Sequence, residues 1–158
     1  AHRDIKPENL AVAGDGKTLK LLDFGSVAPL NEECFDMAGT MPFMSPEVLA
    51  AADTEPYVPA GCDIWASGVV MLEMLCGMGM MNRMLQWGNS IEPEPARCDE
   101  LRAFFADPAP TQEALAAVLG RVDEPLLALV LGMFELDWKK RLSASEAGSC
   151  AYFSAARA

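Results

Sequence analysis

Residues 2–9 read HRDIKPEN, and this stretch decides how the rest of the chain is interpreted. It places a carboxylate, a lysine and an amide side chain within a few positions of one another. Two short apolar runs follow at residues 9–13 and 18–22, and the turn between them contains Asp15-Gly16. Asp-Gly is a strong signal for a tight hairpin turn, so the two runs are predicted to pair as antiparallel strands. The tripeptide DFG, at residues 23–25, begins directly after this hairpin.

Helices are predicted for most of the remaining chain. Residues 61–76 are apolar on nearly every side, which is typical of a helix in the centre of a core. Residues 24–46 are rich in turn formers and lack periodicity, which predicts a long ordered loop. Shorter helices are expected at 46–50, 98–107, 111–119 and 123–136, and a capping box at 143–146 opens the last helix. The predicted fold class is mainly α, with a short N-terminal β-hairpin followed by a helical bundle.

The charge of the chain limits its partners. There are 23 acidic and 12 basic residues, which give a formal net charge of -11. Nucleic-acid binding depends on basic residues that neutralise phosphates, so neither nucleic acid nor an anionic membrane surface is an expected partner. If the chain acts on a peptide, its charge favours a basic one, although plain solubility is the simpler explanation of an acidic surface.

Cysteine, histidine and hydropathy exclude further classes of site. The five cysteines include no C-x-x-C pair and there is one histidine, so neither a zinc site nor a disulfide framework is indicated. Free thiols are typical of a reducing compartment, and a cytoplasmic location is expected. Residues 64–82 approach the length of a membrane span, but Glu73 would lie near its centre and Gly77 and Gly79 would break its end. A buried helix is therefore the expected interpretation.

Three short motifs occur in the order that the protein kinase family shows. Residues 2–9 match its catalytic-loop motif H-R-D-L-x-x-x-N, with isoleucine in place of leucine. Residues 23–25 match its D-F-G motif, and SPE at residues 45–47 is a variant of A-P-E. An isolated D-F-G is more simply a turn, because aspartate and glycine are usual turn formers. As an ordered set, however, the motifs make the chain resemble a eukaryotic-type protein kinase of the serine/threonine branch.

The resemblance implies transfer of the ATP γ-phosphate to serine and threonine hydroxyls of proteins. Asp4 would accept the proton of the substrate hydroxyl, and Lys6 would stabilise charge on the transferred phosphate. Asn9 and Asp23 would hold Mg²⁺, which prefers oxygen ligands. The implied catalytic residues are Asp4, Lys6 and Asn9. The implied contacts to ATP are Lys6, Glu8, Asn9, Ala11 and Asp23, with Ala11 as the floor of the adenine pocket.

The resemblance also implies docking and structural roles. Thr40 would contact Asp4 and Lys6 in the segment that docks the substrate. DIWASG at 63–68 resembles the start of the family's central helix, and DWKKR at 137–141 resembles its D-P-x-x-R motif, with alanine and tryptophan as departures from the two patterns. The implied structural residues are His2, which would pack near Phe24; Arg3; Asp63, which would accept backbone N–H groups of the catalytic loop; and Glu47 and Arg141, which would form a buried ion pair.

Arg3 raises a question of regulation. In the family, an arginine directly before the catalytic aspartate often pairs with a phosphate on the activation segment. Residues 27–39 contain no serine, threonine or tyrosine, but they contain Glu32, Glu33 and Asp36. We therefore hypothesise that a fixed carboxylate from this set pairs with Arg3, so that no phosphate is needed. The alternative is an acidic loop that simply faces solvent.

Residues 1–158 resemble the C-terminal lobe of a kinase domain alone. The catalytic loop would be 2–9, the activation segment 23–47 and the helical subdomain 61–153. The N-terminal lobe is expected to be absent, because neither its Gly-rich phosphate loop nor its V-A-I-K lysine occurs in the sequence. ATP binds between the two lobes, so we expect the chain alone to be inactive and to expose an apolar face. The competing interpretation is a truncated, non-catalytic kinase-like module that acts by binding.

Overall fold

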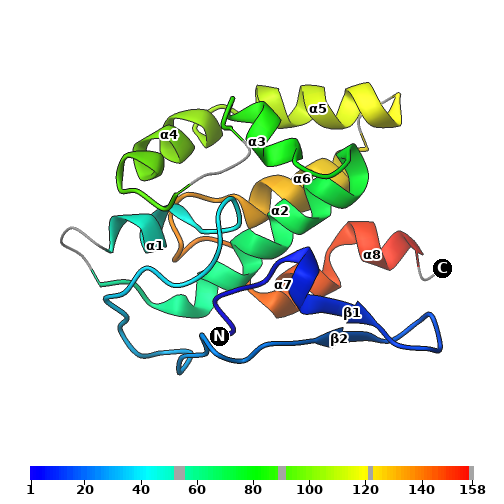
Figure 1. Cartoon of the computed structure of the whole chain (residues 1–158). Coiled ribbons are helices and arrows are strands. Elements are labelled where there is room, and N and C mark those ends of the chain that lie inside the picture. The colour runs from blue at the N-terminus through cyan, green and yellow to red at the C-terminus, as the bar shows by residue number, and fades with distance from the viewer. Residues whose placement is uncertain (52–55, 89–91, 121–122, 157–158) are drawn as a thin grey trace.

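The structure of the protein, a computed structural model, describes residues 1–51, 56–88, 92–120 and 123–156. A two-stranded hairpin and the long loop that follows it lie along one side of a helical bundle (Figure 1). Helices account for most of the regular structure, and the described residues contain one sheet, of two strands. The predicted mainly α fold class with an N-terminal hairpin is confirmed.

The hairpin consists of β1 (Leu10–Val12) and β2 (Leu19–Leu21), which pair in antiparallel fashion. Its turn is held by Asp15, whose carboxylate accepts two backbone N–H groups from the residues after Gly16, both at 2.9 Å. Gly16 has a φ of 67°, in the left-handed region that glycine enters without strain. The Asp-Gly turn therefore performs the role that the sequence predicted for it.

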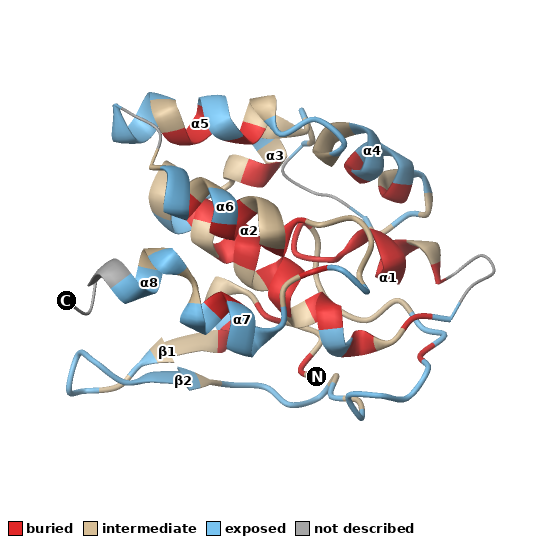
Figure 2. Cartoon of the chain, turned by 180° about the vertical axis from the view of Figure 1, so that it is seen from behind, coloured by how far each residue is buried: buried red, intermediate tan, exposed pale blue. Residues whose placement is uncertain are grey.

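Helix α2 (Cys62–Cys76) runs through the centre of the bundle (Figure 2). Trp65, Val69 and Leu72 on this helix are fully buried, which explains its apolar composition. Within the described residues, one stretch, Pro59–Cys76, is long and apolar enough to cross a membrane, and 61% of it is buried inside the protein. Such burial is what the sequence predicted for this helix.

The other helices pack around α2. Helices α5 (Ala109–Leu119) and α6 (Glu124–Met133) pack directly on α2, and α1 (Pro46–Ala50) packs against α4 (Ala96–Phe105). The remaining helical elements are the short 3-10 turns η1 (Pro7–Asn9) and η2 (Pro59–Gly61) and the helices α3 (Met80–Met84), α7 (Ala144–Ser149) and α8 (Ala151–Ala156).

Helix α6 begins as predicted but is shorter than predicted. The carboxylate of Asp123 caps it by accepting a backbone N–H of the first turn at 3.0 Å. The helix ends at Met133 instead of near residue 136, because Phe134 closes it in a tightened last turn. The chain then turns back, and the N–H of Leu142 donates to the carbonyl of Gly132 at 3.2 Å.

The C-terminal part differs from the prediction of a single last helix. Ser143 and Glu146 form the predicted capping box at the start of α7. Cys150, however, has an extended ψ of 164°, and this residue separates α7 from α8. The box itself is local in sequence and was predicted, whereas the break at Cys150 has no strong breaker residue to announce it.

Helix α3 was not predicted from the sequence. It follows Gly77 and Gly79, which were interpreted as a break and which both have positive φ angles, of 91° and 73°. The guanidinium of Arg83 ties the helix back to the end of α2 by donating to the carbonyl oxygens of Cys76, Gly77 and Met78, at 3.2, 3.2 and 2.7 Å. These contacts satisfy carbonyl groups that the end of α2 leaves without helical partners.

Residues 24–45 form the predicted long ordered loop. They contain no helix or strand apart from a single antiparallel bridge between Cys34 and Tyr57. Both backbone hydrogen bonds of this bridge are present. The N–H of Cys34 donates to the carbonyl of Tyr57, with 2.9 Å between nitrogen and oxygen, and the N–H of Tyr57 donates to the carbonyl of Cys34 at 3.1 Å. The loop is thus anchored at its middle to the segment that precedes α2.

An apolar groove of about 580 Å³ lies between the hairpin and α2. Leu10, Leu21 and Val70 are among the residues that line it, together with Val12 and Met74, which are 67% and 80% exposed. Soluble proteins rarely leave a large contiguous apolar surface exposed without a role for it. The exposed apolar face that the sequence predicted is present on this side of the chain.

Candidate active site

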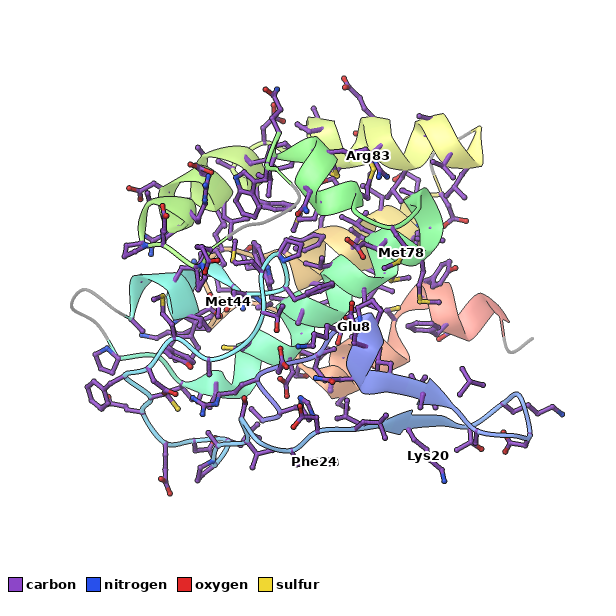
Figure 3. The ribbon with its side chains drawn as sticks, viewed as in Figure 1. Glu8, Lys20, Phe24, Met44, Met78 and Arg83 are labelled. Carbon is purple, nitrogen blue, oxygen red and sulfur yellow. The ribbon has the colours of Figure 1, made fainter. Side chains whose placement is uncertain are left out.

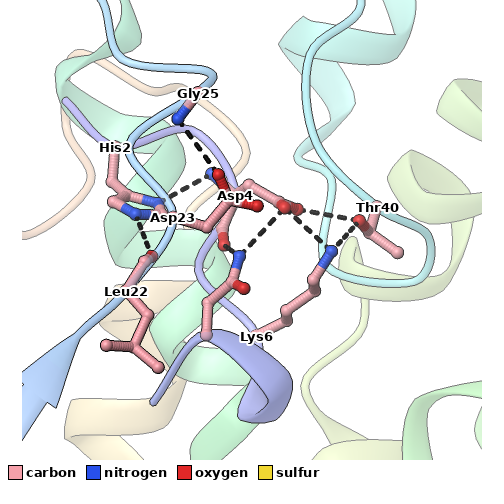
Figure 4. A network of polar contacts seen from close by, with 8 residues as sticks. His2, Asp4, Lys6, Leu22, Asp23, Gly25 and Thr40 are labelled. Atoms are coloured by element: carbon pink, nitrogen blue, oxygen red, sulfur yellow. Dashed lines mark hydrogen bonds and ion pairs between the residues drawn. The ribbon is translucent and has the colours of Figure 1, made fainter. Parts of the chain in front are cut away.

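Asp4, Lys6 and Thr40 form a compact polar cluster (Figure 4). Lys6 Nζ lies 2.8 Å from Asp4 Oδ2 and donates a hydrogen bond to Thr40 Oγ1 at 2.7 Å. The Thr40 hydroxyl in turn donates to Asp4 Oδ1 at 2.8 Å. Both oxygens of the carboxylate are therefore engaged, and a lysine charge lies directly beside them.

Gly39 allows Thr40 to come this close to the catalytic loop. A Cβ at position 39 would lie only 2.8 Å from the carbonyl oxygen of Arg3, a distance that side-chain carbons essentially never show. Gly39 also has a φ of 123°, a backbone conformation that other residues rarely adopt. The glycine before Thr40 is thus required by close backbone approach as well as by conformation.

Asn9 is held by the same aspartate. Its amide nitrogen donates to the backbone carbonyl of Asp4 at 2.8 Å and to Asp4 Oδ2 at 3.0 Å. Because both partners can only accept, the orientation of the amide is fixed, and its oxygen is left available for a ligand. Asn9 is 6% exposed, so this amide oxygen is presented from a well-packed position at the end of η1.

Asp23 is brought next to Asn9 by the hairpin. The N–H of Leu22 donates to the carbonyl of Asn9 at 2.9 Å, directly before Asp23. Asp23 has a φ of 57°, and its exposed carboxylate accepts the N–H of Gly25 at 3.2 Å. The structure thus sets a carboxylate and an amide oxygen that are 14 positions apart in sequence on adjoining segments.

The donor set at Asn9 and Asp23 fits magnesium. Mg²⁺ prefers oxygen ligands, keeps several waters and is usually held by one or two protein groups together with substrate phosphates. Within the described ranges no group of three or more His, Cys, Asp or Glu side chains gathers as a metal site. A divalent ion held by an amide oxygen, a single carboxylate and a phosphate ligand is consistent with both observations.

His2 connects three parts of the site. Its Nε2 pairs with the carbonyl of Leu22 at 2.9 Å, and its Nδ1 accepts the N–H of Asp4 at 3.3 Å. Since a carbonyl can only accept, these contacts correspond to the imidazole with its proton on Nε2. The ring also packs edge-on against Phe24, with 5.3 Å between centroids. His2 is 4% exposed and fastens the DFG segment to the catalytic loop.

Asp63, at the start of α2, binds the backbone of residues 2 and 3. Its two carboxylate oxygens accept the N–H groups of His2 and Arg3, each at 2.7 Å. Arg3 has a φ of 66°, which is unusual for a residue with a side chain and costs conformational energy unless its surroundings fix it. The two charge-assisted hydrogen bonds from the start of α2 supply that fixation immediately before Asp4.

Glu47 and Arg141 form a buried, bidentate ion pair. Arg141 Nη1 lies 2.5 Å from Glu47 Oε1, and Nη2 lies 2.9 Å from Oε2. The guanidinium also donates to the carbonyl of Gly61 at 3.0 Å and stacks over Trp65, 5.1 Å from the ring centroid. The arginine side chain is fully buried, so the pair joins α1, α2 and the segment after α6 inside the core.

The surroundings of Asp4 determine its protonation. Burial on its own would raise the pKa of Asp4, but hydrogen bonds from Lys6, Thr40 and Asn9, with the charge of Lys6, lower this pKa below its ordinary value. Asp4 is therefore a carboxylate at neutral pH. The stabilisation that its partners give to the folded state is complete above the unfolded-state pKa and is lost as the pH falls through the lowered folded-state pKa.

Replacement of Lys6 with methionine should raise the pKa of Asp4. The substitution removes one hydrogen bond and the positive charge that lower this pKa, while burial continues to raise it. Carbon-13 NMR titration of the aspartate carboxyl group measures the shift. Lys17→Met, which alters an exposed lysine in the hairpin turn, is the control and should leave the Asp4 titration unchanged. If Asp4 titrated in the Lys6 variant as it does in the wild type, the electrostatic explanation would be wrong.

The two remaining residues expected to contact ATP, Glu8 and Ala11, lie on η1 and β1. Successive strand residues point to opposite faces, so Ala11 points away from the apolar groove that Leu10 and Val12 line. Glu8 is exposed on η1 beside α2 (Figure 3). Burial raises the pKa of Glu73 on α2, and the nearby charge of Glu8 adds to this effect. Glu8 is thus close enough to α2 for its charge to act on the buried carboxyl group of Glu73.

One residue near the site was missed by the sequence reasoning. Tyr57 is 1% exposed, and its hydroxyl lies between Arg3 and Asp36. No motif marks this tyrosine, because its position depends on the bridge with Cys34. Of the three acidic residues considered as partners of Arg3, the structure pairs Asp36 with it, while Glu32 and Glu33 are exposed.

The chain is similar in sequence to known proteins. The family model of the protein kinase domain matches residues 1–153. Human Rho-associated protein kinase 1 is 41% identical over 80 residues, and rat Citron rho-interacting kinase is 44% identical over 81 residues. A serine/threonine-protein kinase of Drosophila erecta is 39% identical over 80 residues.

These alignments cover 48% of the chain in each case, and 6%, 4% and 10% of the three relatives, respectively. The chain therefore spans a small part of the curated relatives that it matches, whereas the family match extends over nearly its whole length. Together with the mainly α fold and the ordered catalytic motifs, this match leads to one conclusion: the chain belongs to the eukaryotic-type protein kinase family.

Proposed function

We propose that the chain carries the catalytic residues of a serine/threonine protein kinase, which transfers the γ-phosphate of ATP to protein hydroxyl groups. The observation that carries this proposal is the cluster of Asp4, Lys6 and Thr40, with Asn9 bonded to the same carboxylate. Membership of the protein kinase family supports the reaction class. The name of the Drosophila erecta relative supports the serine/threonine branch.

Asp4 would orient the substrate hydroxyl and accept its proton. Its Oδ2 accepts from Asn9 and Lys6, and its Oδ1 accepts from Thr40. An ionised carboxylate offers about four acceptor positions, two on each oxygen, so one position on Oδ1 remains for a hydroxyl. The lowered pKa keeps Asp4 in the accepting form at neutral pH.

Lys6 would bring positive charge to the transferred phosphate, since its Nζ already lies beside Asp4 and Thr40. Asn9 and Asp23 would hold Mg²⁺, which neutralises charge on the phosphate oxygens when bound. Thr40 would contact the substrate next to the phosphoacceptor. The proposed contacts to ATP are Lys6, Glu8, Asn9, Ala11 and Asp23.

A basic protein substrate is part of the proposal. The net charge of -11 attracts cationic peptides at long range, and the exposed Glu8 lies on the same loop as Asp4. The same charge repels nucleic acid and anionic membranes. A substrate with arginine or lysine near its phosphoacceptor would therefore associate faster at low than at high ionic strength.

Phosphoamino-acid analysis tests the proposed function. The 158-residue chain and any longer natural product of its gene are incubated with Mg²⁺, γ-labelled ATP and peptides that contain serine, threonine or tyrosine. We expect phosphoserine and phosphothreonine from a longer product, and from the chain alone no turnover near the usual kinase rates of about 1–100 per second. Phosphotyrosine as the main product would contradict the proposal, and full turnover by the chain alone would contradict the expectation that these 158 residues are inactive by themselves.

The apolar groove supports a second candidate function, that of a non-catalytic binding module. Val12, Leu19 and Met74 expose apolar side chains around this groove, and exposed apolar surface is typical of interaction sites. Binding of Mg²⁺ and ATP separates the two candidates. A longer gene product that binds neither, although it is folded, would favour the binding module.

A further inference from the structure

The side chain of Arg3 joins the catalytic loop to the middle of the activation segment. Its Nη1 donates to Asp36 Oδ1 at 2.8 Å and to the hydroxyl of Tyr57 at 3.3 Å, and its Nε donates to the carbonyl of Ser26. The Arg3 side chain is 10% exposed, although its partner Asp36 is 63% exposed. One guanidinium therefore binds three separate points of the chain.

Tyr57 completes this contact from the other side. Its hydroxyl donates to the backbone carbonyl of Asp36 at 3.1 Å, so Asp36 is held through both its carboxylate and its backbone. The backbone bridge between Cys34 and Tyr57 lies two residues away from Asp36. Burial raises the pKa of Tyr57 to about 12, so its hydroxyl keeps its proton and remains a donor near neutral pH.

The same arginine is fixed at its backbone. The N–H of Arg3 donates to Asp63 Oδ1, and the next residue along the chain is Asp4. Because Arg3 directly precedes Asp4, a movement of the Arg3 side chain would act on the backbone next to the proposed proton acceptor. The carbonyl of Arg3 also faces Gly39, at the point where the activation segment approaches the catalytic loop.

Phosphorylation between residues 27 and 39 cannot provide this contact. Residues 27–39 contain no serine, threonine or tyrosine. The hydroxyl of Thr40 is engaged by Asp4 and Lys6, and a phosphate there would lie against the Asp4 carboxylate. Glu32 and Glu33 are exposed and form no ion pair with any residue that the structure describes. Asp36 is the acidic residue of the segment that reaches Arg3.

We propose that Arg3, Asp36 and Tyr57 form a permanent clasp that holds the activation segment on the catalytic loop without phosphorylation. Asp36 supplies the negative charge that a phosphate would otherwise bring to an arginine. The clasp is a property of the folded chain, and only its regulatory meaning rests on the proposed kinase function. An enzyme built this way has its substrate-docking residue Thr40 positioned at all times.

Amide hydrogen exchange of the full chain tests the clasp. Asp36→Asn removes the charge that Arg3 binds, and Glu33→Gln is the matched control, because it makes the same chemical change three positions away in the same exposed loop. In the Asp36 variant, the bridging amides of Cys34 and Tyr57 should exchange about 3- to 10-fold faster, which corresponds to loss of roughly one hydrogen bond. The Glu33 variant should exchange like the wild type.

Tyr57→Phe provides a second, independent variant. It keeps the buried ring but removes the hydroxyl that joins Arg3 to Asp36. We expect faster exchange at Cys34 in this variant too. In the double variant Asp36→Asn/Tyr57→Phe, the loss of amide protection at Cys34 should be less than the sum of the losses in the two single variants, since both substitutions remove the same contact. Equal exchange in Asp36→Asn, Tyr57→Phe and wild type, with all proteins folded, would overturn the clasp.

Phosphatase treatment tests whether the contact between Arg3 and the activation segment depends on a phosphate group. Exchange of the Cys34 and Tyr57 amides should be the same before and after treatment, and a loss of protection after treatment would overturn the proposal. In a longer, active gene product, Asp36→Asn should lower phosphoryl transfer and Glu33→Gln should not. If no product transfers phosphate, the proposed function fails, while the exchange measurements still decide the clasp.

Discussion

Replacement of Asp4 with asparagine is expected to lower the rate of phosphoryl transfer by about 10²- to 10⁴-fold, the usual contribution of a positioned proton acceptor. The substitution preserves the shape of the side chain but removes the negative charge that Lys6 and Thr40 contact. Lys6 then lacks its counter-charge, and the substrate hydroxyl lacks a carboxylate to accept its proton. The rate is measured with γ-labelled ATP and a saturating serine peptide, in a gene product that is active as wild type.

Two controls separate the chemical role of Asp4 from folding and from nucleotide binding. Asp99→Asn makes the same chemical change on the exposed face of α4, far along the chain from the site, and should retain the wild-type rate. Affinity for Mg²⁺ and ATP is measured in parallel, and the rates are compared at saturating ATP, because Asp4 contacts Lys6 and Asn9, two of the proposed nucleotide contacts. A folded Asp4 variant that keeps more than about a tenth of the rate, a barrier change below roughly 1.4 kcal/mol, would contradict the assigned role.

Features that are local in sequence were predictable. The Asp-Gly turn between two short apolar runs gave the hairpin, and the apolar run around Trp65 gave the central helix. The capping box of Ser143 and Glu146 is another local signal, since both partners lie within one helical turn. In each case the residues that interact are only a few positions apart, so their spacing alone predicts the contact.

Features that depend on the folded arrangement were not predictable in the same way. Thr40 lies 36 positions from Asp4, and neither composition nor spacing brings the two together; only the family resemblance implied their contact. Helix α3 depends on Arg83 binding the carbonyl groups at the end of α2. Tyr57 meets Arg3 only because its backbone pairs with Cys34, and nothing near Tyr57 in the sequence indicates this.

The choice of Asp36 as the partner of Arg3 shows the same limit. The sequence narrowed the partner to Glu32, Glu33 or Asp36, because no hydroxyl residue occurs between positions 27 and 39. Which of the three reaches Arg3 depends on how the loop bends after its bridge to Tyr57, and the folded structure selects Asp36. A pattern of charges can thus predict that an interaction exists without predicting its residue.

Replacement of Glu47 with glutamine is expected to destabilise the protein by about 3–5 kcal/mol, because it leaves a buried charge without its partner. The Arg141 side chain is fully buried and would keep only neutral partners, among them the carbonyl of Gly61 and the ring of Trp65. Domains of this size are stable by only about 5–15 kcal/mol, so this single change removes a large share of the total. Urea denaturation of the full chain, followed by tryptophan fluorescence, measures the loss.

Lys140→Ala is a suitable control for this experiment. Lys140 directly precedes Arg141 and pairs with Asp137 at 3.0 Å, but its side chain is 74% exposed. Ion pairs in solvent contribute little to stability, so this variant should unfold close to the wild-type urea concentration. If Lys140→Ala and Glu47→Gln shifted the midpoint equally, burial of the Glu47–Arg141 pair would not be the source of its effect.

A double variant distinguishes a stranded charge from a lost attraction. Glu47→Leu with Arg141→Met replaces both charges with apolar side chains of similar size, so no charge remains buried without a partner. We expect this double variant to be more stable than Glu47→Gln alone, although it contains two substitutions in the core. If the stability lost in the double variant equalled the sum of the losses in Glu47→Leu and Arg141→Met alone, each residue would stabilise the core through its own packing. Residues that act as a pair give non-additive changes instead.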